Sequence, residues 1–227
     1  MDFEVPPADA SDAEPTGWQR IAGAVESLWN RPPRPPTSGP GQLPPLRATR
    51  RPDADWRIAV LVFQGVTSAE IDEPVRRMAE RLNADVVFVG TGVDHVHAVE
   101  PARYVDIDAT PADAPPADVI VIPGGIGWER LVADTTVMSW LSTTAQSARG
   151  VLAISTGSLL LASAGRLDGQ KSTGHWLAQK DLARLGATVQ SERIVRSDDG
   201  RIVTASGANA AFAAVDELLD RVMWDVH

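Results

Sequence analysis

The chain has 227 residues, of which 44% are hydrophobic and 22% are charged, as in ordinary soluble globular proteins. Its 21 basic residues against 30 acidic ones give a net charge of −9, which argues against binding to nucleic acid or to an anionic membrane surface. The absence of cysteine excludes disulfides, thiolate metal sites and a thiol nucleophile.

Targeting and metal-binding signals are equally sparse. No segment approaches the roughly 20 apolar residues that span a bilayer, and the first residues lack the basic and then apolar pattern of a secretion signal. His95 and His97 have the spacing of a metal-binding pair, but no third ligand is evident. We therefore expect a cytoplasmic protein that holds no metal and no cofactor.

Prolines divide the chain into an arm and a domain. Eleven of the 17 prolines precede residue 54, so residues 31–53 are predicted to be polyproline-like or irregular. Apolar residues at helical spacing predict a short amphipathic helix over residues 17–30, which docks on the main domain or on a partner subunit. A largely disordered tail is the alternative for this segment. The predicted division is an arm over residues 1–54 and an α/β domain over residues 55–227.

From Trp56 onward, apolar strands alternate with amphipathic helices. This alternation predicts a mostly parallel, flavodoxin-like sheet in a three-layer α/β sandwich, with helices on both faces. The strands are expected at 58–63, 86–89, 119–122, 151–154, 194–196 and 202–205, the helices at 70–82, 137–148 and 210–222, and a hairpin-like excursion at 95–107.

The strand predicted at residues 151–154 ends on Ser155, and a helical pattern opens directly behind it. A residue at a sharp strand-to-helix turn has an exposed side chain beside the free N–H groups of a helix start, a geometry that suits a nucleophile. An ordinary turn with Ser155 as the helix N-cap is the alternative from this segment alone.

Four loops carry polar or glycine-rich groups that parallel strands would bring to one edge of the sheet. The glycine pair Gly124 and Gly125 permits a close backbone approach to a ligand. Together with the turn before the last strand, the loops form five fragments in order: F-x-G-V-T-x-x-E from Phe63, I-P-G-G-x-G from Ile122, A-I-x-T-G-S from Ala153, G-x-x-x-T-x-H-W from Gly169 and D-G-R-I-V-T from Asp199.

In this combination the chain resembles the ThiJ/PfpI family of the class I glutamine amidotransferase-like superfamily, over about residues 57–226. The fragments are most similar to the isonitrile hydratase branch, which also resembles the ligand-sensing domains of some AraC-type regulators. Because no helix-turn-helix domain follows Val226 in this sequence, we expect no DNA-binding regulator. A homodimer is implied by the resemblance alone.

The resemblance also implies roles for individual residues. The family's nucleophile falls at Ser155, where its members have cysteine, the acidic partner at Glu70 and the elbow-facing histidine at His175. The family's oxyanion-hole amides fall at Gly125 and Thr156. We add Gly124, Trp128 and Trp176 as candidate substrate-binding residues, of which the two tryptophans would supply apolar walls.

Serine at the nucleophile position leaves three interpretations open. A serine hydroxyl needs a general base within hydrogen-bond reach, and His175 would be that base. Alternatively Glu70 performs the proton chemistry itself, because burial beside an apolar wall raises the pKa of a carboxylate. The third interpretation is that the serine replaces a parental cysteine.

The sequence therefore predicts an enzyme that acts on a small molecule, a hydro-lyase of the isonitrile hydratase type. A diverted acid/base activity on a specialised metabolite, such as a cyclase, dehydratase or isomerase, is included in this prediction. A catalytically silent ligand-binding or scaffold protein that keeps the family pocket is the alternative.

Overall fold

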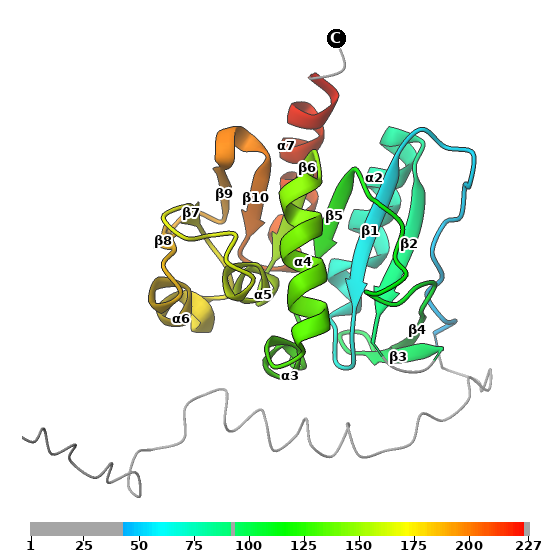
Figure 1. Ribbon diagram of the computed structural model, residues 1–227, viewed down its shortest axis with the longest axis horizontal. Coiled ribbons are helices and arrows are strands. Elements are labelled where there is room, and N and C mark those ends of the chain that lie inside the picture. The colour runs from blue at the N-terminus through cyan, green and yellow to red at the C-terminus, as the bar shows by residue number, and fades with distance from the viewer. Residues whose placement is uncertain (1–42, 92–93, 225–227) are drawn as a thin grey trace, which may run out of the picture.

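The computed structural model describes residues 43–91 and 94–224. The helix predicted over residues 17–30 lies outside these residues, as does the part of the predicted arm that precedes residue 43. A six-stranded sheet forms the centre of the described chain, with α4 in front of it and α2 and α7 behind it (Figure 1).

The sheet has the order β2-β1-β5-β6-β10-β9, and every neighbouring pair is parallel except β10 and β9. Its first five strands follow the doubly wound order of flavodoxin-like folds, which confirms the predicted fold class. The strands are β1 (Arg57–Val62), β2 (Asp85–Gly90), β5 (Val119–Ile122), β6 (Gly150–Ile154), β9 (Ile194–Ser197) and β10 (Ile202–Ala205).

Helices cover both faces of the sheet, as predicted. On one face lie α3 (Trp128–Val132), α4 (Thr135–Ser147) and α5 (Gly157–Ser163), and on the other lie α2 (Asp72–Leu82) and α7 (Ala208–Trp224). Two smaller strand pairs and one helix lie outside the main sheet. The pairs are β3 (His95–Ala98) with β4 (Arg103–Asp106) and β7 (Lys171–Ser172) with β8 (Thr188–Val189), and the helix is α6 (Gln179–Arg184). The hairpin of β3 and β4 confirms the excursion predicted at residues 95–107.

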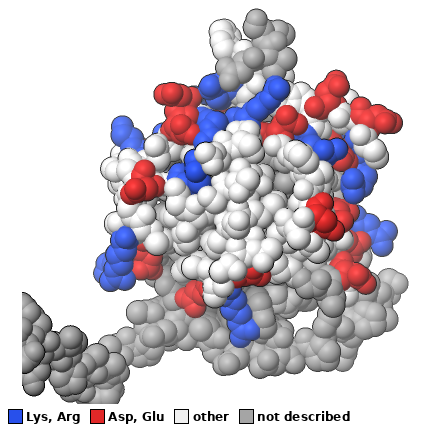
Figure 2. All heavy atoms as spheres, viewed as in Figure 1, with Lys and Arg blue, Asp and Glu red and all other residues white. Residues whose placement is uncertain are grey.

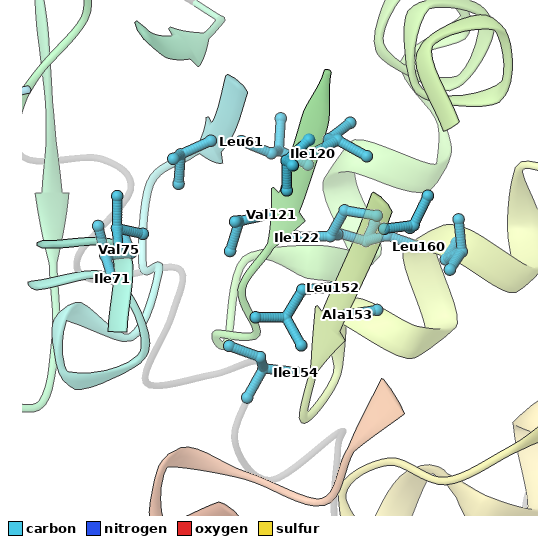
Figure 3. Close-up of a cluster of buried hydrophobic side chains, with 14 of the residues drawn as sticks. Leu61, Ile71, Val75, Ile120, Val121, Ile122, Leu152, Ala153, Ile154 and Leu160 are labelled. Atoms are coloured by element: carbon cyan, nitrogen blue, oxygen red, sulfur yellow. The ribbon is translucent and has the colours of Figure 1, made fainter. Parts of the chain in front are cut away.

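The central strands β1, β5 and β6 are continuous apolar runs because both of their faces are buried. In Figure 3 the side chains of Leu61, Val121 and Leu152 gather from these three strands. Ile71, just before α2, and Leu160 of α5 lie on opposite sides of the strands in this view. The core therefore holds the strand ends in fixed register.

Residues 43–53 run irregularly along the domain rather than forming a helix or a strand of the sheet. Leu46 is buried and forms a bridge with Val105 of β4. Arg50 donates to the buried carboxylate of Asp85, at the start of β2, with an Nε–Oδ1 distance of 3.0 Å, and the amide of Arg51 donates to the same oxygen at 2.7 Å. Leu46 thus fastens the start of this segment to the hairpin of β3 and β4, and the two arginines fasten its end to the amino end of the sheet.

The face of the molecule over α4 is largely uncharged, with acidic and basic side chains around its rim (Figure 2). The helix itself contains no charged residue, and its sequence is rich in serine and threonine. A groove of about 640 Å³ lies between α4 and the loop over residues 111–117. None of the predicted site residues lines this groove.

Candidate functional site

The parallel strands deliver their loops to one edge of the sheet, the lower end in Figure 1, where α3, α5 and the hairpin of β3 and β4 also lie. The chain after β1 contributes the 3-10 turn Ser68–Glu70, the chain after β5 contributes Gly124 and Gly125, and the chain after β6 contributes Ser155. This is the edge at which doubly wound folds bind their ligands.

Ser155 occupies the turn from β6 into α5 with a backbone φ of +59°. Left-handed backbone is costly for a residue with a side chain and persists where the surrounding structure enforces it. The amide of Ser155 donates to the carbonyl of Ala205 at 2.8 Å, which ties the turn to the end of β10. Ser155 is 8% exposed, so the residue is almost entirely removed from solvent.

Glycine is required beside this turn for steric reasons. A Cβ added to Gly124 would lie 2.8 Å from both the Cβ of Ser155 and the amide nitrogen of Thr156. Gly125 has a φ of +153°, and an added Cβ would lie 2.3 Å from the carbonyl oxygen of Gly65. The pair therefore permits the close approach of the strand ends within the protein. The approach of this backbone to a ligand stays a prediction.

Glu70 is only 3% exposed, and the structure brings it together with Ser155. Its Oε2 accepts a hydrogen bond from the amide of Gly124 at 2.6 Å, and its carboxylate also accepts one from the Ser155 hydroxyl. The pKa of Glu70 is raised to about 7, mainly by burial and to a smaller extent by the nearby charge of Glu100, against the hydrogen bonds from Gly124 and Ser155, which lower it. Both protonation states of Glu70 are therefore populated near neutral pH.

The amides of the glycine pair already have acceptors. That of Gly124 is bound to Glu70, and that of Gly125 donates to the Oγ1 of Thr156 at 2.9 Å. The Thr156 hydroxyl in turn donates to the carbonyl of Gly125 at 3.2 Å. An oxyanion role for the Gly125 amide therefore requires that a substrate displace the Thr156 hydroxyl.

His175 lies on the segment that follows β7, next to the elbow. A Cβ added to the preceding Gly174 would be 2.9 Å from the carbonyl oxygen of Ser155. The Nδ1 of His175 accepts a hydrogen bond from the amide of Leu177 at 3.3 Å, so the neutral ring carries its proton on Nε2. Partial burial lowers the pKa of His175. A neutral imidazole with this tautomer is a donor at Nε2, which disfavours it as the base for Ser155.

The two tryptophans differ in their surroundings. Trp128 begins α3, and its half-buried ring packs against the hydrophobic core. Trp176 is 71% exposed, and its ring lies at a tilt to that of His175, with centroids 5.7 Å apart. Trp176 is thus a large apolar side chain at the surface beside the site rather than within it.

Glu100 is a charged neighbour of the site that no pattern in the sequence singles out. It is exposed and lies in the turn between β3 and β4, and its charge raises the pKa of both Glu70 and His175. Neither a glycine signature nor a strand end marks it in the sequence. Only the pairing of this hairpin with the turn before α2 brings it to the site.

The described residues contain no group of three or more histidine, aspartate or glutamate side chains that could hold a metal ion. His95 and His97 instead pack edge-on against Tyr104, with ring centroids 5.1 Å and 5.5 Å apart. Within the same part of the chain, no helix is long and apolar enough to cross a membrane.

Comparison with known proteins places this geometry in a family. The profile of the DJ-1/PfpI family matches residues 56–221. The chain belongs to the DJ-1/PfpI family. A crystal structure of a ThiJ/PfpI family protein from Pseudomonas syringae is 28% identical, with a TM-score of 0.65 over 85% of this chain and 76% of that one.

Two curated relatives belong to different functional classes. The isonitrile hydratase of Pseudomonas putida is 40% identical over 98 residues, and the HTH-type transcriptional regulator GbdR of Pseudomonas aeruginosa is 32% identical over 114 residues. These matches span 43% and 50% of this chain but only 42% and 31% of the relatives.

Proposed function

We propose that the protein is a hydro-lyase of the isonitrile hydratase type, in which Glu70 is the general acid and base. The observation that carries the proposal is the buried carboxyl of Glu70, which accepts a hydrogen bond from Ser155 and has a pKa of about 7. The similarity to an isonitrile hydratase supports the choice of substrate. A general acid or base works best when its pKa lies near the working pH.

The reaction adds one water molecule to an isonitrile and yields an N-substituted formamide, in which the terminal carbon has gained the oxygen and one hydrogen and the nitrogen the other hydrogen. Glu70 in its acid form transfers its proton to the isonitrile carbon, which leaves that carbon electrophilic and Glu70 ionised. Water then adds to the carbon and returns a proton to the Glu70 carboxylate. The resulting imidic acid shifts its remaining hydroxyl proton to nitrogen and becomes the formamide.

Ser155 orients this proton transfer in the proposal. Its hydroxyl donates to Glu70, and its left-handed backbone fixes the side chain at the end of β6. No covalent step through serine is needed, which fits the tautomer of His175. A diverted acid/base activity on another specialised metabolite would use the same two residues.

The test is the formation of the N-substituted formamide from cyclohexyl isonitrile, which chromatography quantifies. The wild type is expected to turn it over, Glu70→Gln to lose turnover, and Ser155→Ala to keep a reduced rate because its hydroxyl only orients Glu70. Ser155→Cys tests whether a thiol adds a covalent route. The matched control is Glu80→Gln, which changes an exposed glutamate in α2. Full activity in Glu70→Gln would contradict the proposal.

A catalytically silent ligand-binding protein is the second candidate. The engagement of the Gly125 amide by Thr156 favours it, because an oxyanion donor is then occupied. The similarity to the regulator GbdR over half of this chain also supports a binding role. Isonitrile binding without turnover, in both the wild type and Ser155→Cys, would favour this second candidate.

A further inference from the structure

Glu100 is held in a fixed position next to Glu70 by backbone hydrogen bonds. Its carbonyl accepts from the amide of Ala69, the residue before Glu70, at 3.2 Å. On either side of Glu100, the carbonyl of Val99 accepts from the amide of Ser68 at 2.8 Å, and the carbonyl of Pro101 accepts from the Ser68 hydroxyl at 2.7 Å. The turn between β3 and β4 is thus fastened to the turn that carries the buried acid.

The backbone of Glu100 is itself unusual, with a φ of +54°. Ser155 shares this left-handed conformation, so two of the positive-φ residues with side chains in the described chain belong to this edge. Such conformations cost free energy and cluster at ligand sites. The side chain of Glu100 is exposed, so its carboxylate can meet a ligand that approaches the elbow.

Glu100 is the charged residue that acts on both titratable groups of the site. Its negative charge raises the pKa of Glu70 and of His175, and no arginine or lysine contributes to either shift. Arg103, on the same hairpin, is bound to the carboxylate of Asp72 and to the carbonyl of Pro44. The exposed ring of Trp176 lies beside His175 and offers an aromatic face, to which cations are attracted.

We infer that Glu100 is a specificity-determining residue that makes the entrance of the site prefer cationic substrates over uncharged ones and reject carboxylates. The inference rests on the proposed function for the choice of isonitriles, and it assigns to that function a substrate class. Glu100 takes no part in the proton transfer. Its carboxylate attracts a positive substituent on the side of the substrate that faces solvent.

Three isonitriles of similar size separate the effects of charge and shape. These are (2-isocyanoethyl)trimethylammonium, its uncharged isostere 3,3-dimethylbutyl isonitrile and 3-isocyanopropanoate. Dissociation constants are measured by NMR titration of the full chain carrying Glu70→Gln, in which turnover is expected to be lost and the charge of Glu70 is removed. We expect the cation to bind about fivefold more tightly than its isostere and the carboxylate more weakly than both, as for partly exposed charge pairs.

Adding Glu100→Gln is expected to remove this ranking, whereas adding the control substitution Glu80→Gln is expected to keep it. An unchanged preference for the cation after Glu100→Gln would overturn the inference. Equal binding of all three compounds to the protein that keeps Glu100 would overturn it as well. If none of the compounds binds, the proposed isonitrile function fails.

The electrostatic effect of Glu100 on the site can also be measured without any substrate. The pKa of His175, read from its imidazole NMR signals, is expected to fall in Glu100→Gln because a nearby negative charge that raises it is lost. An unchanged His175 pKa in Glu100→Gln would overturn the inference whether or not the isonitriles bind. Glu80→Gln, with its substitution in α2, is expected to leave that pKa unchanged.

Discussion

Two buried carboxylates at opposite ends of the parallel sheet have opposite electrostatic surroundings. Asp85, at the amino end of β2, is 1% exposed, and Glu70, at the carboxyl end of the sheet, is 3% exposed. Although burial raises the pKa of Asp85, hydrogen bonds and charge from Arg50, Arg51 and Arg57 more than offset it and lower the pKa. Glu70 accepts hydrogen bonds from Gly124 and Ser155, and its pKa rises to about 7.

The comparison separates a carboxylate that holds the fold from one that is suited to chemistry. Asp85 receives enough charged and polar donors to remain ionised, so it fastens residues 50–57 to the sheet. Glu70 lacks that compensation and gains a proton easily. Perturbed ionisable groups of this kind concentrate at functional sites.

The largest expected effect is on catalysis by Glu70→Gln. The amide still fills the space but cannot transfer a proton, so kcat for isonitrile hydration should fall about 10²- to 10⁴-fold. The measurement is the steady-state rate of formamide formation at neutral pH. A rise in KM alone, with kcat retained, would show that Glu70 binds substrate without transferring a proton.

The same residue should make stability depend on pH. Because the folded pKa of Glu70 is raised from 4.5 to about 7, its ionisation destabilises the fold as pH rises through this range. Relative to the wild type, Glu70→Gln should therefore become more stable by about 3 kcal/mol between pH 4 and pH 8. Urea unfolding at the two pH values measures the difference, and equal differences at both would refute the raised pKa.

Asp85→Asn should lower the free energy of unfolding by about 2 kcal/mol at neutral pH, because it leaves Arg50 and Arg57 without their buried anion. The folded pKa of Asp85 is lowered, so its stabilising contribution is present above the unfolded pKa and lost as pH falls through the folded pKa. The matched control is Asp106→Asn, whose ion pair with Arg47 is exposed and worth about 1 kcal/mol or less. If thermal unfolding shows the same loss of stability for Asp85→Asn and Asp106→Asn, the buried ion pairs of Asp85 are worth no more than the exposed pair of Asp106, and the contrast is wrong.

Gly124→Ala should have the smallest effect on stability, about 1–2 kcal/mol, because its Cβ must displace the Ser155 turn. The same displacement moves Ser155 away from Glu70 and should lower isonitrile turnover as well. Gly207→Ala is the control, since nothing lies within 4 Å of the added Cβ. We predict that this control retains both stability and turnover.

The hydrophobic periodicity was sufficient to predict the sheet and helices, because strands buried on both faces leave continuous apolar runs such as Val119–Ile122. It placed Glu70 inside a helix over residues 70–82, whereas the residue ends a 3-10 turn and α2 begins at Asp72. The roles assigned to the site residues remain predictions. The contact of Glu70 with Ser155 follows from parallel strand ends meeting at one edge.

The parts that could not be predicted depend on contacts between segments distant in the sequence. The position of Glu100 results from the backbone hydrogen bonds between its hairpin and the turn before α2. The engagement of the Gly125 amide depends on the side-chain rotamer of Thr156, which no sequence pattern specifies. The exposure of Trp176 likewise depends on the path of the chain after β7.

The most direct test of the account is the pKa of Glu70 itself. The wild-type protein with ¹³C-labelled glutamate is titrated by NMR, and the Glu70 carboxyl signal is assigned by its absence in Glu70→Gln. We predict a midpoint near pH 7. A midpoint near 4.5, the ordinary value for a glutamate, would contradict it.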